Sequence, residues 1–402
     1  MARTHTAAAV VAALFLASSM FGHTVALRLL LLGTGLIVTA MVAFQPRKDV
    51  RLLPPIWLPF LLWGVWALLS LGWSIEPERS WKEWRNEVFY TGGALWICYV
   101  AAQMPNALRI FPLVAAAAAT LVCGAALFTF WQGWPQYADG WHGGPGDHSS
   151  ALVVLMPLAA MAGWYGVRAR QYWTAIAGIG LVGLFLASTY TTLNRAIWLA
   201  LAVQFVALGG FLLMRSELGA GRSGKARART YAWASVALAC CATLILSVQG
   251  HREGMGVVRA LDQDTRFALY PQILERIRAQ PLLGYGFGRG LLRESLQTEL
   301  KSTDPHLWHA HNLFLEALVQ LGIPGLVLLL AIVWAIGQRA WHYARDADEL
   351  RAACGMALFA VLAGTVARNM TDFLLVRQNA LLFWGVVGAL VALGAKPWPA
   401  RS

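Results

Sequence analysis

A group of histidines stands at the start of a long apolar stretch, where an imidazole could exchange a proton with a ligand. His306, His309 and His311 precede Asn312 and the run LFLEALVQLGIPGLVLLLAIVWAI. An imidazole titrates near neutral pH and can take a proton from a hydroxyl group. Imidazoles are also common Zn²⁺ ligands, so a metal site is the alternative.

The local sequence argues against that metal site. In a helix, His309 and His311 would lie on different faces. No cysteine lies near them, and Asp304 is the one nearby carboxylate in the sequence. We therefore expect no metal and no cofactor.

Composition indicates where these residues must be positioned. The chain has 402 residues, of which 58% are hydrophobic and 13% charged, with long apolar runs at 25–44 and 231–248. About 20 such residues cross a bilayer as a helix, which gives about twelve spans. Their centres lie near residues 14, 35, 64, 96, 120, 158, 181, 204, 240, 326, 361 and 387. We predict an all-α, polytopic membrane bundle, with residues 1–402 forming a single transmembrane catalytic domain.

The basic segments predict the orientation of this bundle. Residues 45–51, 168–171, 215–229 and 338–351 are rich in Lys and Arg and all fall on one side of it. Cytoplasmic loops carry such an excess, so this side and both termini should be cytoplasmic. The net charge of +12 is then a consequence of topology, and it gives no reason to expect a nucleic-acid partner.

The longest segment outside the spans should lie on the opposite, outer face. Residues 250–310 separate the ninth and tenth spans, and a connection of this length is usually functional. Within it, RFALYPQILERIRA at 266–279 has the apolar spacing of short amphipathic helices, with Pro271 near a helix start or kink. PLLGYGFG at 281–288 predicts a glycine-rich turn. No strand precedes these glycines, so we do not expect nucleotide binding.

Three arginines are placed in outer segments, against the usual charge bias. Arg195 follows a Ser/Thr-rich stretch, Arg266 follows the acidic DQD segment, and Arg289 follows the glycine-rich turn. Each could be an anchor to lipid headgroups. Alternatively they could bind an anion, because guanidinium stays charged and can bind phosphate oxygens bidentately.

Three patterns occur in these segments. Arg195 begins a middle helix after a Ser/Thr-rich stretch, and an arginine followed by P-x-x-G-x-G-x-G spans Arg266 and residues 281–288. Histidine and asparagine at 311 and 312 begin an H-N-x9-G-x-x-G pattern that ends at Gly322 and Gly325. In this order, the three patterns resemble those of the O-antigen ligase family of membrane glycosyltransferases, which also includes O-antigen polymerases and pilin oligosaccharyltransferases.

The resemblance implies a fold like that of other membrane-embedded, GT-C-like glycosyltransferases, with one large periplasmic loop. It implies transfer of O-antigen from undecaprenyl pyrophosphate to a sugar hydroxyl of lipid A-core. The reaction would occur at the periplasmic face of a Gram-negative inner membrane. The partners would be this donor, this acceptor and membrane lipids.

Roles for individual residues follow from the resemblance. His311 would be the base, and Arg195 and Arg266 would bind the donor pyrophosphate, with Arg289 a weaker candidate. Asp372, in RNMTDF, would orient a catalytic group or the acceptor, and the alternative for it is a capping carboxylate. Asn312 would support the site. The two glycines of the motif, Gly322 and Gly325, would shape the helix that bears His311.

Other function classes stay open. A polymerase would join the same donor to another carrier-linked glycan, and a pilin oligosaccharyltransferase would use a protein hydroxyl. A lipid flippase or transporter would need polar residues through the inner half of the bundle, which the sequence does not display. A non-catalytic scaffold would have no need of a basic groove beside a histidine.

Overall fold

The computed structural model describes residues 2–44, 50–133, 140, 141, 143–192, 194–218, 237, 240, 266–289, 291, 309–373 and 375–395. Its elements there are helices, with one isolated bridge between Gly140 and Gly143. They are α1 (Ala2–Ser18), α2 (Val25–Ala43), α3 (Trp57–Leu69), η1 (Ser70–Gly72), α4 (Pro77–Trp84), η2 (Arg85–Phe89), α5 (Tyr90–Ala102), α6 (Ala107–Trp131), α7 (Pro145–Arg168), α8 (Tyr172–Thr191), α9 (Arg195–Leu218), α12 (Arg266–Ala279), α15 (Leu313–Ala344), α16 (Glu349–Asn369) and α17 (Arg377–Ala395).

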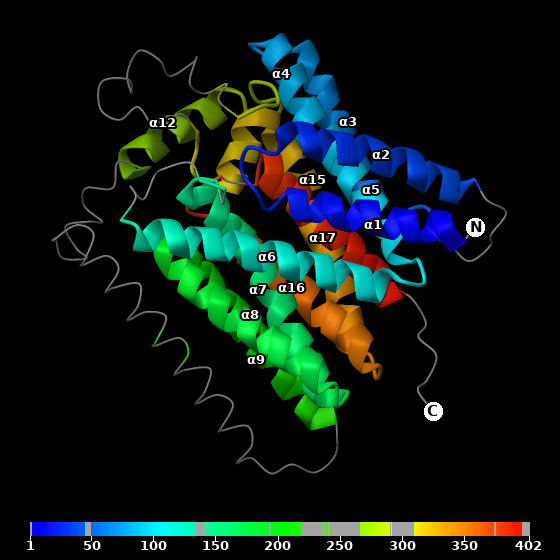
Figure 1. Ribbon diagram of the computed structural model, residues 1–402. Coiled ribbons are helices and arrows are strands. Elements are labelled where there is room, and N and C mark those ends of the chain that lie inside the picture. The colour runs from blue at the N-terminus through cyan, green and yellow to red at the C-terminus, as the bar shows by residue number, and fades with distance from the viewer. Residues whose placement is uncertain are drawn as a thin grey trace.

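The described helices form an inner group and a surrounding layer (Figure 1). Most residues of α7, α16 and α17 are buried, because these helices pack against neighbours on several sides. Most residues of α2, α6 and α8 lie outward and are largely apolar, as lipid-facing helices are. The close contact of α7 with α8 depends on small residues: a Cβ at Gly178 would meet the backbone of Gly163.

The prediction of an all-helical membrane bundle is confirmed for the described residues. Eight of their helices are long and apolar enough to cross a bilayer, and α1 and α3 are shorter apolar helices. The predicted span near residue 96 is α5, which continues α4 and η2. The span near residue 240 lies outside the described residues except for positions 237 and 240, so the count of twelve stays a prediction.

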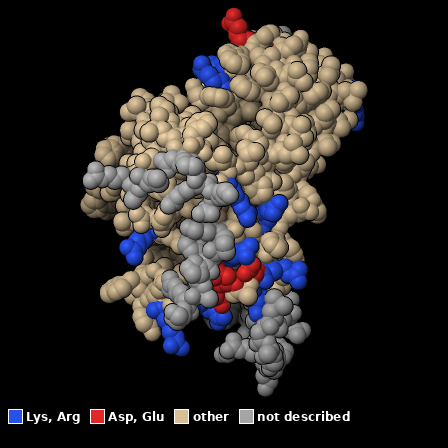
Figure 2. Space-filling model, turned by 90° about the vertical axis from the view of Figure 1, so that its right-hand side faces the viewer, with Lys and Arg blue, Asp and Glu red and all other residues tan. Residues whose placement is uncertain are grey.

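Charged residues gather at one end of the bundle, toward the bottom of Figure 2. This is the end where α7 and α9 finish and α16 begins. There Glu349 pairs with Arg168 at 2.8 Å and with Arg215 at 3.0 Å, and Asp346 pairs with Arg351 at 2.8 Å. Several of the basic residues that the sequence assigns to the cytoplasm are therefore adjacent in space.

Residues 266–279, where the apolar spacing indicates short amphipathic helices, form the single helix α12, with Pro271 inside it. Its buried side chains, Leu269 and Ile273, pack with Tyr285, Ala310 and Val319. This contact holds the amphipathic helix against the first part of α15. Of the predicted outer loop 250–310, the structure describes residues 266–289, 291, 309 and 310.

α15 is broken near its middle at Gly322, whose φ of 66° and ψ of −167° are not helical. Pro324 has no N–H and cannot bond the carbonyl of Gln320 within the helix. The N–H of Gly286 donates to that carbonyl instead, at 3.0 Å. A Cβ at Gly322 would meet the Leu282 carbonyl oxygen, so the break needs a glycine there.

The glycine-rich turn at 281–288 is fastened to the bundle by its backbone. The N–H of Tyr285 donates to the Val319 carbonyl at 2.9 Å, and the N–H of Phe287 donates to Ser70 Oγ at 2.9 Å. The indole of Trp73 donates to the Leu283 carbonyl at 2.9 Å. Residue 289 is thereby held beside the start of α15.

Candidate functional site

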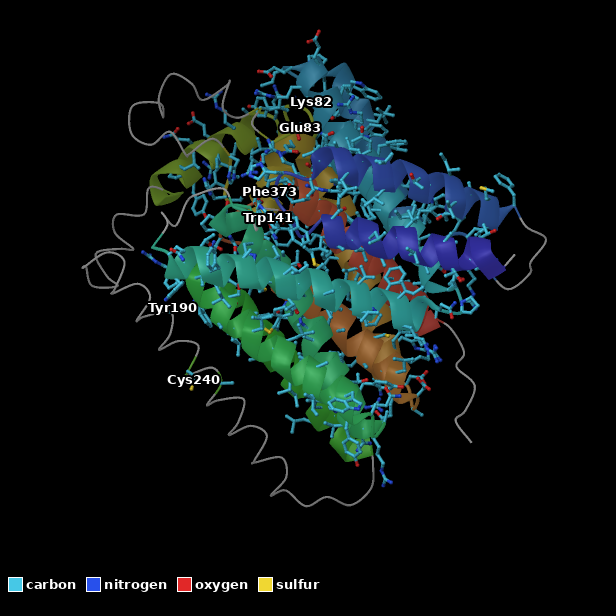
Figure 3. The ribbon with its side chains drawn as sticks, in the orientation of Figure 1. Lys82, Glu83, Trp141, Tyr190, Cys240 and Phe373 are labelled. Carbon is cyan, nitrogen blue, oxygen red and sulfur yellow. The ribbon has the colours of Figure 1, made fainter. Side chains whose placement is uncertain are left out.

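The candidate site lies at the end of the bundle opposite the Arg168–Glu349 pair. α7, α9, α15 and α17 begin at this end, and α16 finishes there. Figure 3 labels Phe373, which follows Asp372 in the segment between α16 and α17, and Glu83 of the nearby α4. Several polar side chains here are buried, including those of His309, His311, Glu316 and Arg368.

His309 and His311 lie in a turn that precedes α15, with their rings in contact. The ring centroids are 3.8 Å apart, and the N–H of His311 donates to Nδ1 of His309 at 3.0 Å. The expectation that the two side chains lie on different faces of a helix is therefore wrong. The helix begins only at Leu313, and the positive φ of His311, 47°, turns its side chain back toward His309.

Asp372 holds the imidazole of His311 from the other side. Nδ1 of His311 is 3.2 Å from Oδ1 of Asp372, and Nη2 of Arg368 is 3.9 Å from Oδ2. Burial alone would raise the pKa of Asp372, but the hydrogen bond from His311 and the charge of Arg368 hold that pKa well below its usual range. The ionised carboxylate accepts from Nδ1–H and fixes the tautomer whose Nε2 has a free lone pair.

The other nitrogen of His311 is available for chemistry. Nε2 is buried and has no hydrogen-bond partner in the part of the chain that the structure describes. A buried imidazole with one nitrogen held by a carboxylate and the other unpartnered is arranged as a general base.

Arg289 contacts the group formed by His309, His311 and Asp372, on the side of His309. Its Nη2 is 3.0 Å from Nε2 of His309. Burial lowers the pKa of the Arg289 guanidinium, and the nearby charges of Asp372 and Glu316 raise it. The sequence candidates His311, Asp372 and Arg289 therefore belong to one connected group.

A chain of buried hydrogen bonds links this group to the glycine-rich turn. Glu316 accepts from the N–H of Ala310 at 2.7 Å and from Nε2 of Gln320 at 2.7 Å. Gln320 in turn accepts from the N–H of Gly288 at 3.0 Å. The first two turns of α15 thus fix both the histidine turn and the residue that precedes Arg289.

Asn312 stabilises the start of α15 and its contact with the end of α16. Its side chain caps α15 by accepting from the N–H groups of Phe314 and Leu315, at 3.0 and 3.2 Å. Its amide also donates to the Met370 carbonyl at 3.2 Å. Asn312 therefore ties the start of α15 to the end of α16, just before Asp372. Gly322 and Gly325 lie further along α15, at the break in that helix.

The remaining arginine candidates lie at the same end of the bundle. Arg195 is the half-buried first residue of α9. Its neighbour Asn194 reaches Ser149 Oγ at 3.4 Å, and Arg368 reaches the same oxygen at 3.4 Å. Arg266 begins α12, but the position of its side chain lies outside what the structure describes, as does His306.

A metal ion could be held here by a set of ligands different from the one the sequence suggests. His309, His311 and Asp372 offer ligand atoms that all lie within 4.8 Å of one another. However, Arg289 lies 3.0 Å from Nε2 of His309, and Arg368 lies 3.9 Å from Oδ2 of Asp372. Two fixed positive charges beside the ligands oppose a cation, so this donor set does not fit a metal well.

Two comparisons with known proteins bear on this arrangement. Residues 148–330 match the family model described as O-Antigen ligase. Residues 148–330 carry an O-antigen ligase family domain. A search among curated proteins finds no match.

This O-antigen ligase domain runs from the start of α7 into α15 and confirms the resemblance drawn from the sequence. It includes Arg195, Arg266, Arg289 and His311, whereas Asp372 lies beyond it. Sequence reasoning missed Arg368, Glu316 and Gln320. The signal for Arg368 is its position four residues before Asp372, in the last turn of α16.

Proposed function

We propose that the protein is an O-antigen ligase that transfers O-antigen from undecaprenyl pyrophosphate to a sugar hydroxyl of lipid A-core. The family domain supports glycosyl transfer of this general kind. The arrangement of His311 and Asp372 carries the proposal further, because it provides a base for the acceptor hydroxyl. The transfer needs no metal in this mechanism.

The proton and the bonds can be followed atom by atom. The acceptor hydroxyl gives its proton to Nε2 of His311 as its oxygen attacks the anomeric carbon of the donor sugar. The bond between that carbon and the phosphate oxygen breaks, and the pyrophosphate leaves with the electron pair. Asp372 stabilises the resulting imidazolium. A single displacement of this kind inverts the anomeric carbon.

Arginines would stabilise the charge that gathers on the leaving pyrophosphate. Arg195 and Arg266 are our main candidates, and Arg289 supports them from beside His309. Fixed cations near a developing charge lower the barrier, since they need no reorganisation during the reaction. Arg195 begins α9 beside Asn194, which reaches the Ser149 hydroxyl that Arg368 also reaches, and this position near Asp372 supports its part in such a clamp.

We further propose that this end faces the periplasm from a Gram-negative inner membrane, with both termini in the cytoplasm. The test uses a variant in which the five native cysteines are replaced and Leu300→Cys is the single cysteine of the protein. In intact spheroplasts that express it, an impermeant thiol reagent should label the protein. The matched Lys225→Cys protein should react only after lysis, because 215–229 carries the cytoplasmic basic cluster. Labelling of position 225 and not of 300 in intact spheroplasts would reverse the orientation.

Deletion and complementation test the function and the arginines together. The deletion strain should contain lipid A-core without O-antigen and should accumulate carrier-linked O-antigen, seen as loss of the lipopolysaccharide ladder on a gel. The wild-type gene should restore the ladder.

Arg195→Ala or Arg266→Ala should reduce ligation by about a hundredfold, since a charged hydrogen bond contributes about 1.5–3 kcal/mol. Lysine should rescue only partly, because a point charge cannot bind bidentately.

The same strain separates the alternatives. If long O-antigen were missing from the carrier itself, the polymerase function would replace the ligase function. If carrier-linked O-antigen accumulated only on the cytoplasmic side, a transporter would be favoured. A full ladder from Arg195→Ala at normal expression would assign Arg195 to lipid anchoring instead.

A further inference from the structure

Glu87 lies in an unusual turn of the helix that borders the site. The helix α4 passes into the π-helical turn η2 before α5 begins. Such turns insert an extra residue, redirect side chains and are frequent at functional sites. One turn before Glu87, the side chain of Glu83 lies where a Cβ on Gly288 would meet it, so this face of the helix borders the end of the glycine-rich turn that Arg289 follows.

The carboxyl group of Glu87 is only half satisfied. Its Oε1 accepts from the N–H of Arg377 at 2.8 Å, and Arg377 has a positive φ of 50°. Its Oε2 is buried and has no hydrogen-bond partner among the described residues. An unpartnered polar atom in a buried position carries a free-energy cost, which a bound ligand would remove.

Burial and, to a smaller extent, the surrounding charges determine which form of this carboxyl is present. Burial raises the pKa of Glu87 to about 8, and the charge of Glu83 on α4 adds to this shift. The N–H and charge of Arg377, at the start of α17, and the charge of Arg289 act in the opposite direction. At neutral pH most of the molecules therefore carry a protonated Glu87, whose O–H is a donor.

We propose that Glu87 is a further residue of the donor site, donating its carboxylic O–H to a phosphate oxygen of the carrier lipid. This inference rests on the proposed function. The geometry that supports it is the buried, unpartnered Oε2 of Glu87 and the close approach of the same helix to Gly288, the residue before Arg289. Arg289 in turn lies 3.0 Å from Nε2 of His309. A phosphate bound beside Arg289 and Arg377 would have oxygens to accept this bond, whereas a carboxylate at the same place would repel it.

The test compares the pH dependence of transfer in matched variants of the full-length protein. Between pH 7 and pH 9, wild-type activity should fall about tenfold, as a group with a pKa of about 8 loses its proton. Glu87→Gln should lower activity at pH 7 by about threefold and remove this fall, because an amide keeps a donor at all pH values. Glu87→Ala should lower activity by about tenfold.

Glu83→Gln is the matched control on the preceding turn. It removes a neighbouring carboxylate whose charge raises the pKa of Glu87 but leaves the Glu87 donor, so the alkaline fall should persist and begin at a lower pH. A flat wild-type profile would overturn the inference. So would an equal fall in wild type, Glu83→Gln and Glu87→Gln, since the titrating group would then be elsewhere.

Binding measurements separate this inference from the proposed function. Glycan-free undecaprenyl pyrophosphate and purified lipid A should each be titrated into the detergent-solubilised protein at pH 7 and pH 9. Undecaprenyl pyrophosphate should bind more weakly at pH 9 to the wild type but not to Glu87→Gln, even if transfer to lipid A-core failed. A change confined to lipid A would overturn the assignment to the donor.

Discussion

Replacing His311 with alanine should reduce glycan transfer by roughly 10²–10⁴-fold while carrier lipid still binds. The lone pair of Nε2 is the proton acceptor in the proposed mechanism, and no other described imidazole at this end combines a carboxylate on one nitrogen with an unpartnered second nitrogen. The arginines that would hold the pyrophosphate remain in the variant. The measurement is the initial rate of transfer by purified protein, together with the Kd for undecaprenyl pyrophosphate.

His309→Ala is the informative comparison. Its ring supports His311 by contact and accepts the N–H of His311, so its loss should slow transfer by only about tenfold. Activity should persist in EDTA. Equal damage from His309→Ala and His311→Ala, with loss of activity in EDTA and recovery with Zn²⁺, would instead support a metal held by His309, His311 and Asp372.

The fold could be predicted from composition because a bilayer sets simple demands on length and polarity. The apolar periodicity of residues 266–279 indicated helical structure, and Leu269 and Ile273 are the side chains of α12 that pack against neighbouring elements. The sequence suggested a start or kink at Pro271, which lies inside this one helix. The spans were harder to count. α3 and α5 are shorter than a typical span. A 3-10 turn at 70–72 follows α3, and a π-helical turn at 85–89 precedes α5.

The contacts within the site could not be predicted in the same way. His311 and Asp372 are 61 positions apart, and no local pattern tells which loops meet at one end of a bundle. Periodicity also gave the wrong relation between His309 and His311, because it assumed a helix where a positive φ makes a turn. Glu87 had no signal in sequence, since its properties depend on burial and on Arg377, 290 positions away.

The carboxylate of Asp372 should matter almost as much as the base itself. It positions His311 by accepting Nδ1–H at 3.2 Å, which leaves the lone pair on Nε2. In Asp372→Asn the amide has nearly the same shape, but its NH₂ group can donate to Nδ1 and favour the tautomer with the proton on Nε2. That tautomer cannot accept a proton from the acceptor, so kcat should fall by roughly 10³–10⁴-fold, as in catalytic triads.

A positioning role predicts a specific split in the kinetic constants. The KM for the carrier-linked donor should change little in Asp372→Asn, because the arginines remain, and the folded protein should be recovered in normal yield. Asp372→Glu should regain part of kcat, since it restores an acceptor for Nδ1–H at an altered distance. Asp346→Asn, at the opposite end of the bundle, controls for loss of a carboxylate. If Asp372→Asn instead raised KM and left kcat unchanged, Asp372 would bind a substrate and His311 would have to hold its tautomer without it.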